Sequence, residues 1–161
     1  MVKAIRIHTA GGPEQMQWED VEVGAPAAGQ VRVRHTAIGL NFIDVYHRTG
    51  LYPLPLPHGL GMEGAGVVEA VGDGVTDLAE GDRVAYASPP PGSYAEARLI
   101  AGDALVKIPD GVDDETAAAM MLKGMTAHFL IRQTYRVTAG DTILIHACLL
   151  YTSDAADEHG C

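Results

Sequence analysis

The chain has 161 residues, of which 47% are apolar, and it carries 11 Lys and Arg against 21 Asp and Glu, a formal net charge of −10. This length and apolar content are enough for the core of an ordinary domain. The negative charge argues against nucleic acid, whose phosphates need clustered basic side chains, and against an anionic lipid surface. No apolar run approaches the roughly 20 residues of a membrane span, and no apolar leader segment is present. We therefore expect a cytoplasmic protein.

Cysteine is confined to the end of the chain, at Cys148 and Cys161. Neither a disulfide framework nor a cysteine-based zinc site is therefore expected in residues 1–147. The histidines show no metal-ligand spacing such as H-E-x-x-H, so we expect them to be structural or exposed.

The first part of the chain predicts strands separated by glycine-rich turns. Apolar and polar residues alternate in residues 3–8 and 31–34, as they do in half-buried strands. Further extended segments are expected over residues 16–23, 64–71, 83–86 and 93–100. This pattern predicts a mostly β fold with some α-helix, built as a partly open barrel.

Two helices are expected. Asn41 to Thr49 predicts a short helix that ends at Gly50 in the left-handed conformation. Acidic residues 113–115 favour a helix start, and residues 116–131 predict a long helix in which Gly124 is the one expected site of interruption. The nearly continuous apolar run of residues 141–147 is typical of a buried parallel strand, the beginning of an α/β domain.

A literal G-x-G-x-x-G motif occurs at residues 59–64. Nucleotide binding by this motif requires a strand before it and a helix after it. Here a proline-rich segment precedes the motif and an apolar β stretch follows it. The motif is therefore interpreted as a tight turn that enters a strand.

Several polar side chains have both a functional and a structural explanation. Asn41, Asp44, Tyr46 and Arg48 could form a site on one short helix, or a solvated helix face with Asn41 as its N-cap. Tyr52 could be a packing ring or a hydrogen-bond donor in a cleft. Lys123, among methionines and leucine, either extends to solvent or reaches a buried anion; the sequence slightly favours solvent.

Five segments together resemble one family, the NADPH:quinone oxidoreductases, which are the zeta-crystallin-like branch of the medium-chain dehydrogenase/reductases. The segments are AIGLNFIDVYHRTGLYP at residues 37–53, GMEGAGVV at 61–68, GDRV at 81–84, GSYAE at 92–96 and LKGMT at 122–126. The resemblance extends over residues 1 to about 147 in order.

The resemblance implies a GroES-like catalytic domain over residues 1–125 and the first strand of a truncated Rossmann cofactor domain over residues 126–147. It also implies hydride transfer from NADPH to a quinone or another conjugated carbonyl, and a homodimeric full-length parent. The implied catalytic residues are Asn41, Tyr46, Tyr52 and Lys123. The implied cofactor-binding residues are Asn41, Phe42, Ile43, Asp44, Val45, Tyr46, Lys123 and Thr126.

The sequence departs from the wider family at three places. Zinc-dependent relatives carry Gly-His-Glu where this chain has Gly61-Met62-Glu63, and a cysteine near Asn41, so no catalytic zinc is expected. Relatives often have a tyrosine where this chain has His128-Phe129, which leaves a cofactor contact there without its usual side chain. After residue 147 the family continues with a glycine-rich pyrophosphate loop, which this chain lacks.

Residues 148–161 instead match the translation of a sequencing adapter, so we expect this tail to be non-native. Because most of the implied cofactor domain is missing, we expect the chain alone to be inactive towards quinones. Two other functions remain open. One is an NADPH-dependent enal or enoyl-thioester reductase of the same superfamily, since fold does not decide substrate. The other is a non-enzymatic, crystallin-type protein built on the GroES-like domain.

Overall fold

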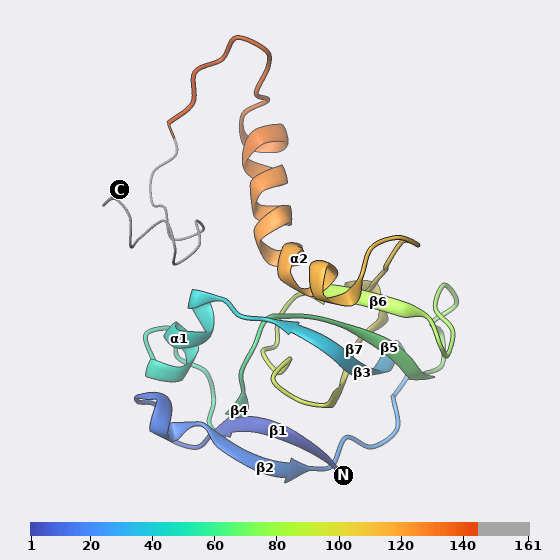
Figure 1. Ribbon diagram of the computed structural model, residues 1–161. Coiled ribbons are helices and arrows are strands. Elements are labelled where there is room, and N and C mark those ends of the chain that lie inside the picture. Colours follow the sequence, from blue (N-terminus) through green and yellow to red (C-terminus); the bar gives the residue numbers. More distant parts are fainter. Residues whose placement is uncertain (145–161) are drawn as a thin grey trace. The chain divides into compact units, whose positions relative to one another are not determined.

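Two antiparallel sheets form the framework of the first part of the chain (Figure 1). A three-stranded sheet has the order β2-β1-β4, with β1 at Val2–Ile7, β2 at Gln17–Val21 and β4 at His58–Gly59. A five-stranded sheet has the order β7-β3-β5-β6-β8, with β3 at Gln30–Gly39, β5 at Glu63–Val71, β6 at Arg83–Ala87, β7 at Ala97–Ala101 and β8 at Val106–Lys107. The mostly β fold is confirmed. The sheets are joined at a bridge between Ala4 and Ala95 and do not close into a barrel.

The computed structural model describes residues 1–144, which belong to two units, Met1–Ala127 and the chain from His128 onward. In the second unit, a π-helical segment (η3) occupies Phe129–Thr134. Residues 141–144 have no regular structure, and residues 145–147 of the expected parallel strand lie outside the described residues, as does the tail 148–161. Within residues 1–144, no helix combines the length and the apolar composition needed to cross a membrane.

The larger of two core clusters lies on one face of the five-stranded sheet, where the alternation in β3 buries Val31 and Val33 completely. These valines pack with residues of β5, β6, β7 and the loops beyond: Val68, Leu78, Val84, Tyr86, Ile100 and Leu105. Neighbouring strands hold these side chains in register, since Val33 pairs with Val68 across the β3–β5 ladder. The core therefore fixes the position of β5, whose first residue is Glu63.

Truncating a core valine should destabilise the fold far more than truncating an exposed one. Val33→Ala removes two methyl groups from a fully buried position, and we expect it to lower the free energy of unfolding by about 2 kcal/mol. Val106→Ala, at a valine that is 49% exposed, should lower it by less than about 0.5 kcal/mol. Urea unfolding of both variants measures the difference, and equal losses would contradict this placement of the core.

The short helix α1 (Phe42–Thr49) begins and ends as the sequence predicts. Asn41 stands at its N-cap, and Gly50 ends it with φ 80° in the left-handed region. The proline-rich segment that follows leads into β4. The structure agrees with the interpretation that residues 59–64 are not a nucleotide-binding motif, because strand β5 and not a helix follows them. Gly61 has φ 91°, and a Cβ there would overlap Ser93 and Tyr94.

The long helix α2 (Asp114–His128) starts two residues earlier than predicted. The side chain of Asp113 accepts a hydrogen bond from the Thr116 backbone N–H at 2.6 Å, which caps the helix as the acidic sequence there suggests. The helix runs through Gly124 without interruption and ends at His128, three residues before the predicted end at residue 131. Ala117 and Ala118 pack on the sheet at Ala65 and Ala85, so the first turns of α2 are anchored to β5 and β6.

Two predicted strands are shorter in the structure: residues 16–23 give only β2 at Gln17–Val21, and the segment 93–100 also shortens. Residues 93–100 were expected to be extended throughout, but β7 begins at Ala97. The backbone N–H groups of Gly92 and Ser93 both donate to the Gly61 carbonyl, which makes this part a loop against the turn before β5. The loop carries Tyr94 towards α1.

Candidate functional site

The site is organised around Glu63, the first residue of β5, whose side chain is completely buried. One carboxylate oxygen, Oε1, accepts a hydrogen bond from the Asn41 Nδ2 at 2.7 Å and lies 3.4 Å from the Lys123 Nζ. The other oxygen, Oε2, accepts from the backbone N–H of Leu122 at 2.7 Å. The carboxylate thus joins β5, the start of α1 and the middle of α2. We call Asn41, Glu63 and Lys123 the carboxylate cluster.

Asn41 makes two hydrogen bonds at the start of α1. The Asp44 Oδ2 accepts the backbone N–H of Asn41 at 3.0 Å, and the Asn41 side-chain amide donates to Glu63. Asn41 is 8% exposed and Asp44 4% exposed. The alternative of a solvated helix face is therefore wrong at these two residues, although Asn41 does occupy the N-cap.

Asp44 also receives a second hydrogen bond, from the Tyr94 hydroxyl at 2.9 Å. Burial raises the pKa of the Asp44 carboxyl above its ordinary value, and the two hydrogen bonds oppose that rise. Burial, followed by the neighbouring Asp44 carboxylate, raises the pKa of Tyr94 in turn. Through its two hydrogen bonds, Asp44 ties the start of α1 to the loop that carries Tyr94.

Lys123 reaches the buried anion instead of extending fully to solvent. Its Nζ lies 3.3 Å from the Leu40 carbonyl oxygen and 3.4 Å from the Glu63 Oε1, while 39% of its side chain remains exposed. The expectation of a solvent-directed lysine is therefore wrong. An ammonium group has three N–H donors, so two acceptors leave one donor for a ligand.

An aromatic cluster lies on α1 and just beyond it. The rings of Phe42 and Tyr46 meet edge to face with centroids 5.2 Å apart, and the rings of Tyr46 and Tyr52 are also 5.2 Å apart. The Tyr52 backbone N–H donates to the Tyr46 carbonyl at 3.2 Å. Tyr52 is a packing ring, as one alternative held, yet it remains 50% exposed, so its position also suits a ligand contact.

The remaining predicted residues, Ile43, Val45 and Thr126, lie on α1 and α2. Ile43 and Val45 are half-buried on α1. Thr126 is exposed, and its hydroxyl donates to the Leu122 carbonyl one turn earlier at 2.7 Å. Thr126 therefore takes no part in the carboxylate cluster.

Two residues of this site were not among the predicted ones, Glu63 and Tyr94. Both stand in motifs of the resemblance, GMEGAGVV and GSYAE. An acidic residue between glycines at the start of an apolar strand is an unusual choice, because a buried carboxylate is unfavourable without partners. That contrast was the available signal for Glu63.

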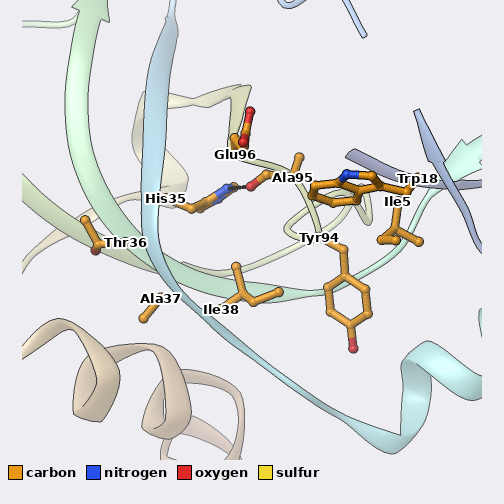
Figure 2. A pocket seen from close by; sticks show the side chains of 9 residues that line it. All are labelled: Ile5, Trp18, His35, Thr36, Ala37, Ile38, Tyr94, Ala95 and Glu96. Carbon is orange, nitrogen blue, oxygen red and sulfur yellow. Dashed lines mark hydrogen bonds between the residues drawn. The ribbon is translucent and has the colours of Figure 1, made fainter. Parts of the chain in front are cut away.

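A separate open cavity of about 340 Å³ lies between the two sheets (Figure 2). Trp18 and Ile5 line one side, and His35 and Ile38 of β3 line the other. None of the predicted site residues lines it. Its connection to the site is Tyr94, whose ring lines the cavity and whose hydroxyl reaches Asp44.

Among residues 1–144, no three His, Cys, Asp or Glu side chains gather into a group that could hold a metal ion. Met62, where zinc-dependent relatives have histidine, is buried. The absence of a catalytic zinc remains a prediction.

Comparison with known proteins shows which family the chain resembles. The alcohol dehydrogenase GroES-like domain matches residues 27–110. Quinone oxidoreductase from Pseudomonas aeruginosa is 55% identical over 148 residues, which are 91% of this chain and 46% of that protein. A 2-haloacrylate reductase from a Burkholderia species is 51% identical over 154 residues, with the same two shares.

A solved structure agrees with these relatives. Escherichia coli quinone oxidoreductase complexed with NADPH superposes with a TM-score of 0.82 at 44% identity, covering 84% of this chain and 42% of that one. The chain spans somewhat under half the length of these proteins. The domain match alone includes more than half of the 161 residues. This chain belongs to the family of the alcohol dehydrogenase GroES-like domain.

Proposed function

We propose that this chain is the catalytic-domain part of an oxidoreductase that transfers a hydride from NADPH to a quinone. The observation that carries the proposal is the carboxylate cluster, which holds a lysine ammonium and an asparagine amide. The residue after that asparagine is the exposed Phe42. The similar Pseudomonas protein is named a quinone oxidoreductase, and the similar Escherichia coli structure contains NADPH.

The residues around the start of α1 suit the nicotinamide end of the cofactor. Leu40 is 79% exposed and Phe42 56% exposed, so they offer an apolar edge for a flat ring. The free N–H of Lys123 lies next to the Leu40 carbonyl and can meet a ligand oxygen. NADPH, when bound there, supplies the hydride.

The chain's own residues stabilise charge on the acceptor. A carbonyl oxygen that receives electrons gains negative charge, and donors already in place lower the energy of that state without rearrangement. Lys123 is the main donor because its ammonium group is charged, and Asn41, Tyr46 and Tyr52 offer neutral donors. Phe42, Ile43, Asp44, Val45 and Thr126 are proposed to shape the cofactor side.

The domain boundaries and the assembly belong to the same proposal. Residues 1–125 form the GroES-like catalytic domain, and residues 126–147 begin a Rossmann cofactor domain. The full-length parent is a cytoplasmic homodimer. The continuous α2, which runs from the sheet to His128, supports a helix that links the two domains.

The proposal is tested with residues 1–147 joined to the remaining half of the Pseudomonas relative. We expect the joined protein to oxidise NADPH with 1,4-benzoquinone, and Lys123→Met to reduce kcat by about 100-fold, the usual effect of losing one donor to a developing oxyanion. Lys107→Met removes an exposed lysine that pairs with Asp82 and should leave kcat unchanged. Full activity in the Lys123→Met variant would contradict the proposed role.

A second acceptor class is favoured by the similarity to a 2-haloacrylate reductase. The same donors would stabilise the enolate oxygen of a conjugated acid or thioester. Comparing 1,4-benzoquinone, 2-chloroacrylate and crotonyl-CoA as acceptors with the joined protein separates the classes. Binding of NADPH without reduction of any acceptor would favour a non-enzymatic protein instead.

A further inference from the structure

Glu63 is an unusual residue to find fully buried, and its surroundings show how it is stabilised. Its side chain has no exposed surface, and three donors from two helical segments meet its two oxygens: the Asn41 amide, the Leu122 backbone N–H and the Lys123 ammonium. Burying a carboxylate costs several kcal/mol unless charged and hydrogen-bonding partners compensate. The carboxylate is therefore bound in a fixed geometry.

The backbone makes room for this carboxylate at Gly39, the last residue of β3. A Cβ at that position would overlap the Glu63 side chain and the backbone carbonyl of Ala118 in α2. β3, the carboxylate and α2 thus approach as closely as the chain allows. The position of the Glu63 oxygens is determined by backbone on one side and by donors on the other.

We propose that Glu63 is a positioning residue, which holds the Lys123 ammonium and the Asn41 amide where an acceptor oxygen can use them. Glu63 itself lies too deep to touch a substrate, so it acts through Lys123 and Asn41. The expected effect of Glu63 on catalysis rests on the proposed function. Its effect on the position of Lys123 does not.

The alternative is that Glu63 serves only to anchor α2 through the Leu122 N–H. Glu63→Gln separates the two roles. A glutamine has one acceptor oxygen and one donor nitrogen, so it can keep the Leu122 bond while it places N–H groups against the donors of Asn41 and Lys123. Lys123 then loses its anionic partner.

Amine labelling of the 161-residue chain measures the placement of Lys123 directly. The chain has three lysines, and two of them, Lys3 and Lys123, have nearly equal side-chain exposure at 38% and 39%. Lys3 pairs with Asp20, which is 50% exposed, and Lys123 pairs with the buried Glu63. An exposed ion pair opens easily, so the amine of Lys3 should be accessible to acetic anhydride. The acetylation rate at Lys123 should be at most about one third of the rate at Lys3.

In Glu63→Gln, Lys123 should react about as fast as Lys3, with Lys3 and Lys107 as internal standards. Glu69→Gln, which removes a partner of Arg32 and Arg34 elsewhere on β5, should leave the rate at Lys123 as it is in the wild type. Equal rates at Lys3 and Lys123 in the wild-type chain would overturn the proposal even if Glu63→Gln failed to fold. An unchanged rate at Lys123 in a folded Glu63→Gln would also overturn it.

The joined protein gives the catalytic readout. We expect Glu63→Gln to lower kcat by about tenfold while the KM for NADPH changes less than about twofold. The double variant with Lys123→Met should lose much less than the product of the two single losses, because Glu63 acts largely through that lysine. Additive losses would overturn the positioning role. If no variant or wild-type protein reduces a quinone, the proposed function fails, and the labelling result still decides the placement of Lys123.

Discussion

Lowering the pH from about 6.5 to about 4 is expected to cost the fold about 3 kcal/mol through one residue, His35. The His35 Nδ1 lies 2.6 Å from the Ala95 carbonyl, which can only accept, so this nitrogen carries the proton. The Nε2 then accepts from the Tyr86 hydroxyl at 2.7 Å. The neutral ring is fully satisfied, and a second proton would displace the Tyr86 hydrogen bond.

Burial is the main cause that lowers the pKa of His35 from 6.5 to about 4; the nearby Arg98 acts in the same direction, and the hydrogen bond to the Ala95 carbonyl opposes both. Between these two values the unfolded chain binds a proton that the folded chain does not. The stability contributed by His35 is therefore complete above about pH 6.5 and is lost as the pH falls towards 4. Each pKa unit corresponds to about 1.4 kcal/mol, which gives the expected size.

Two other buried groups, His47 and Asp44, also change the stability of the fold with pH. Burial also lowers the pKa of His47, which acts in the same direction as His35. Burial raises the pKa of Asp44, so this carboxyl favours the folded state at lower pH. The contribution of His35 must therefore be measured as a difference between proteins.

Urea unfolding of the wild type and of His35→Gln at about pH 7 and about pH 4.5 gives that difference. Glutamine retains a donor and an acceptor but does not titrate in this range, so its stability should fall less steeply with pH. His8→Gln removes an exposed histidine paired with Glu19 and should follow the wild-type slope. Parallel slopes for the wild type and His35→Gln would contradict the buried, neutral His35.

Features that depend on nearby residues were predictable from the sequence. Helix α1 is bounded by Asn41 and Gly50, which carry their own conformational preferences. The start of α2 was indicated by Asp113, whose side chain caps the helix three residues on. The alternation of Val31 and Val33 indicated the buried face of β3.

The carboxylate cluster depends on residues that are distant in the sequence. Glu63 lies 22 residues from Asn41 and 60 residues from Lys123, so no local pattern connects them. The resemblance pointed to Asn41 and Lys123 as separate site residues, and only the fold shows that Glu63 joins them. The same limitation explains the error at Lys123, whose apolar neighbours in the sequence do not reveal the anion on strand β5.

Two Gly→Ala variants should change the free energy of unfolding in opposite directions, because residues distant in the sequence confine one glycine and not the other. Gly39→Ala adds a methyl group where the Glu63 side chain and the Ala118 carbonyl already stand, so either the carboxylate or α2 must move. Overpacking of this kind costs about 1–3 kcal/mol, and backbone contact places the expected loss at the upper end, about 3 kcal/mol. Local sequence around Gly39 contains no sign of this constraint.

Gly124→Ala is the matched control, because it adds the same atoms inside α2. A Cβ there would meet only Met120, at 3.9 Å and beyond, and alanine favours a helix interior by about 1 kcal/mol over glycine. We therefore expect Gly124→Ala to raise the urea midpoint and Gly39→Ala to lower it. Lys123 should also label faster in Gly39→Ala, since a displaced Glu63 no longer holds its ammonium group. A Gly39→Ala variant with wild-type stability and wild-type labelling would show that β3 and α2 do not confine the carboxylate.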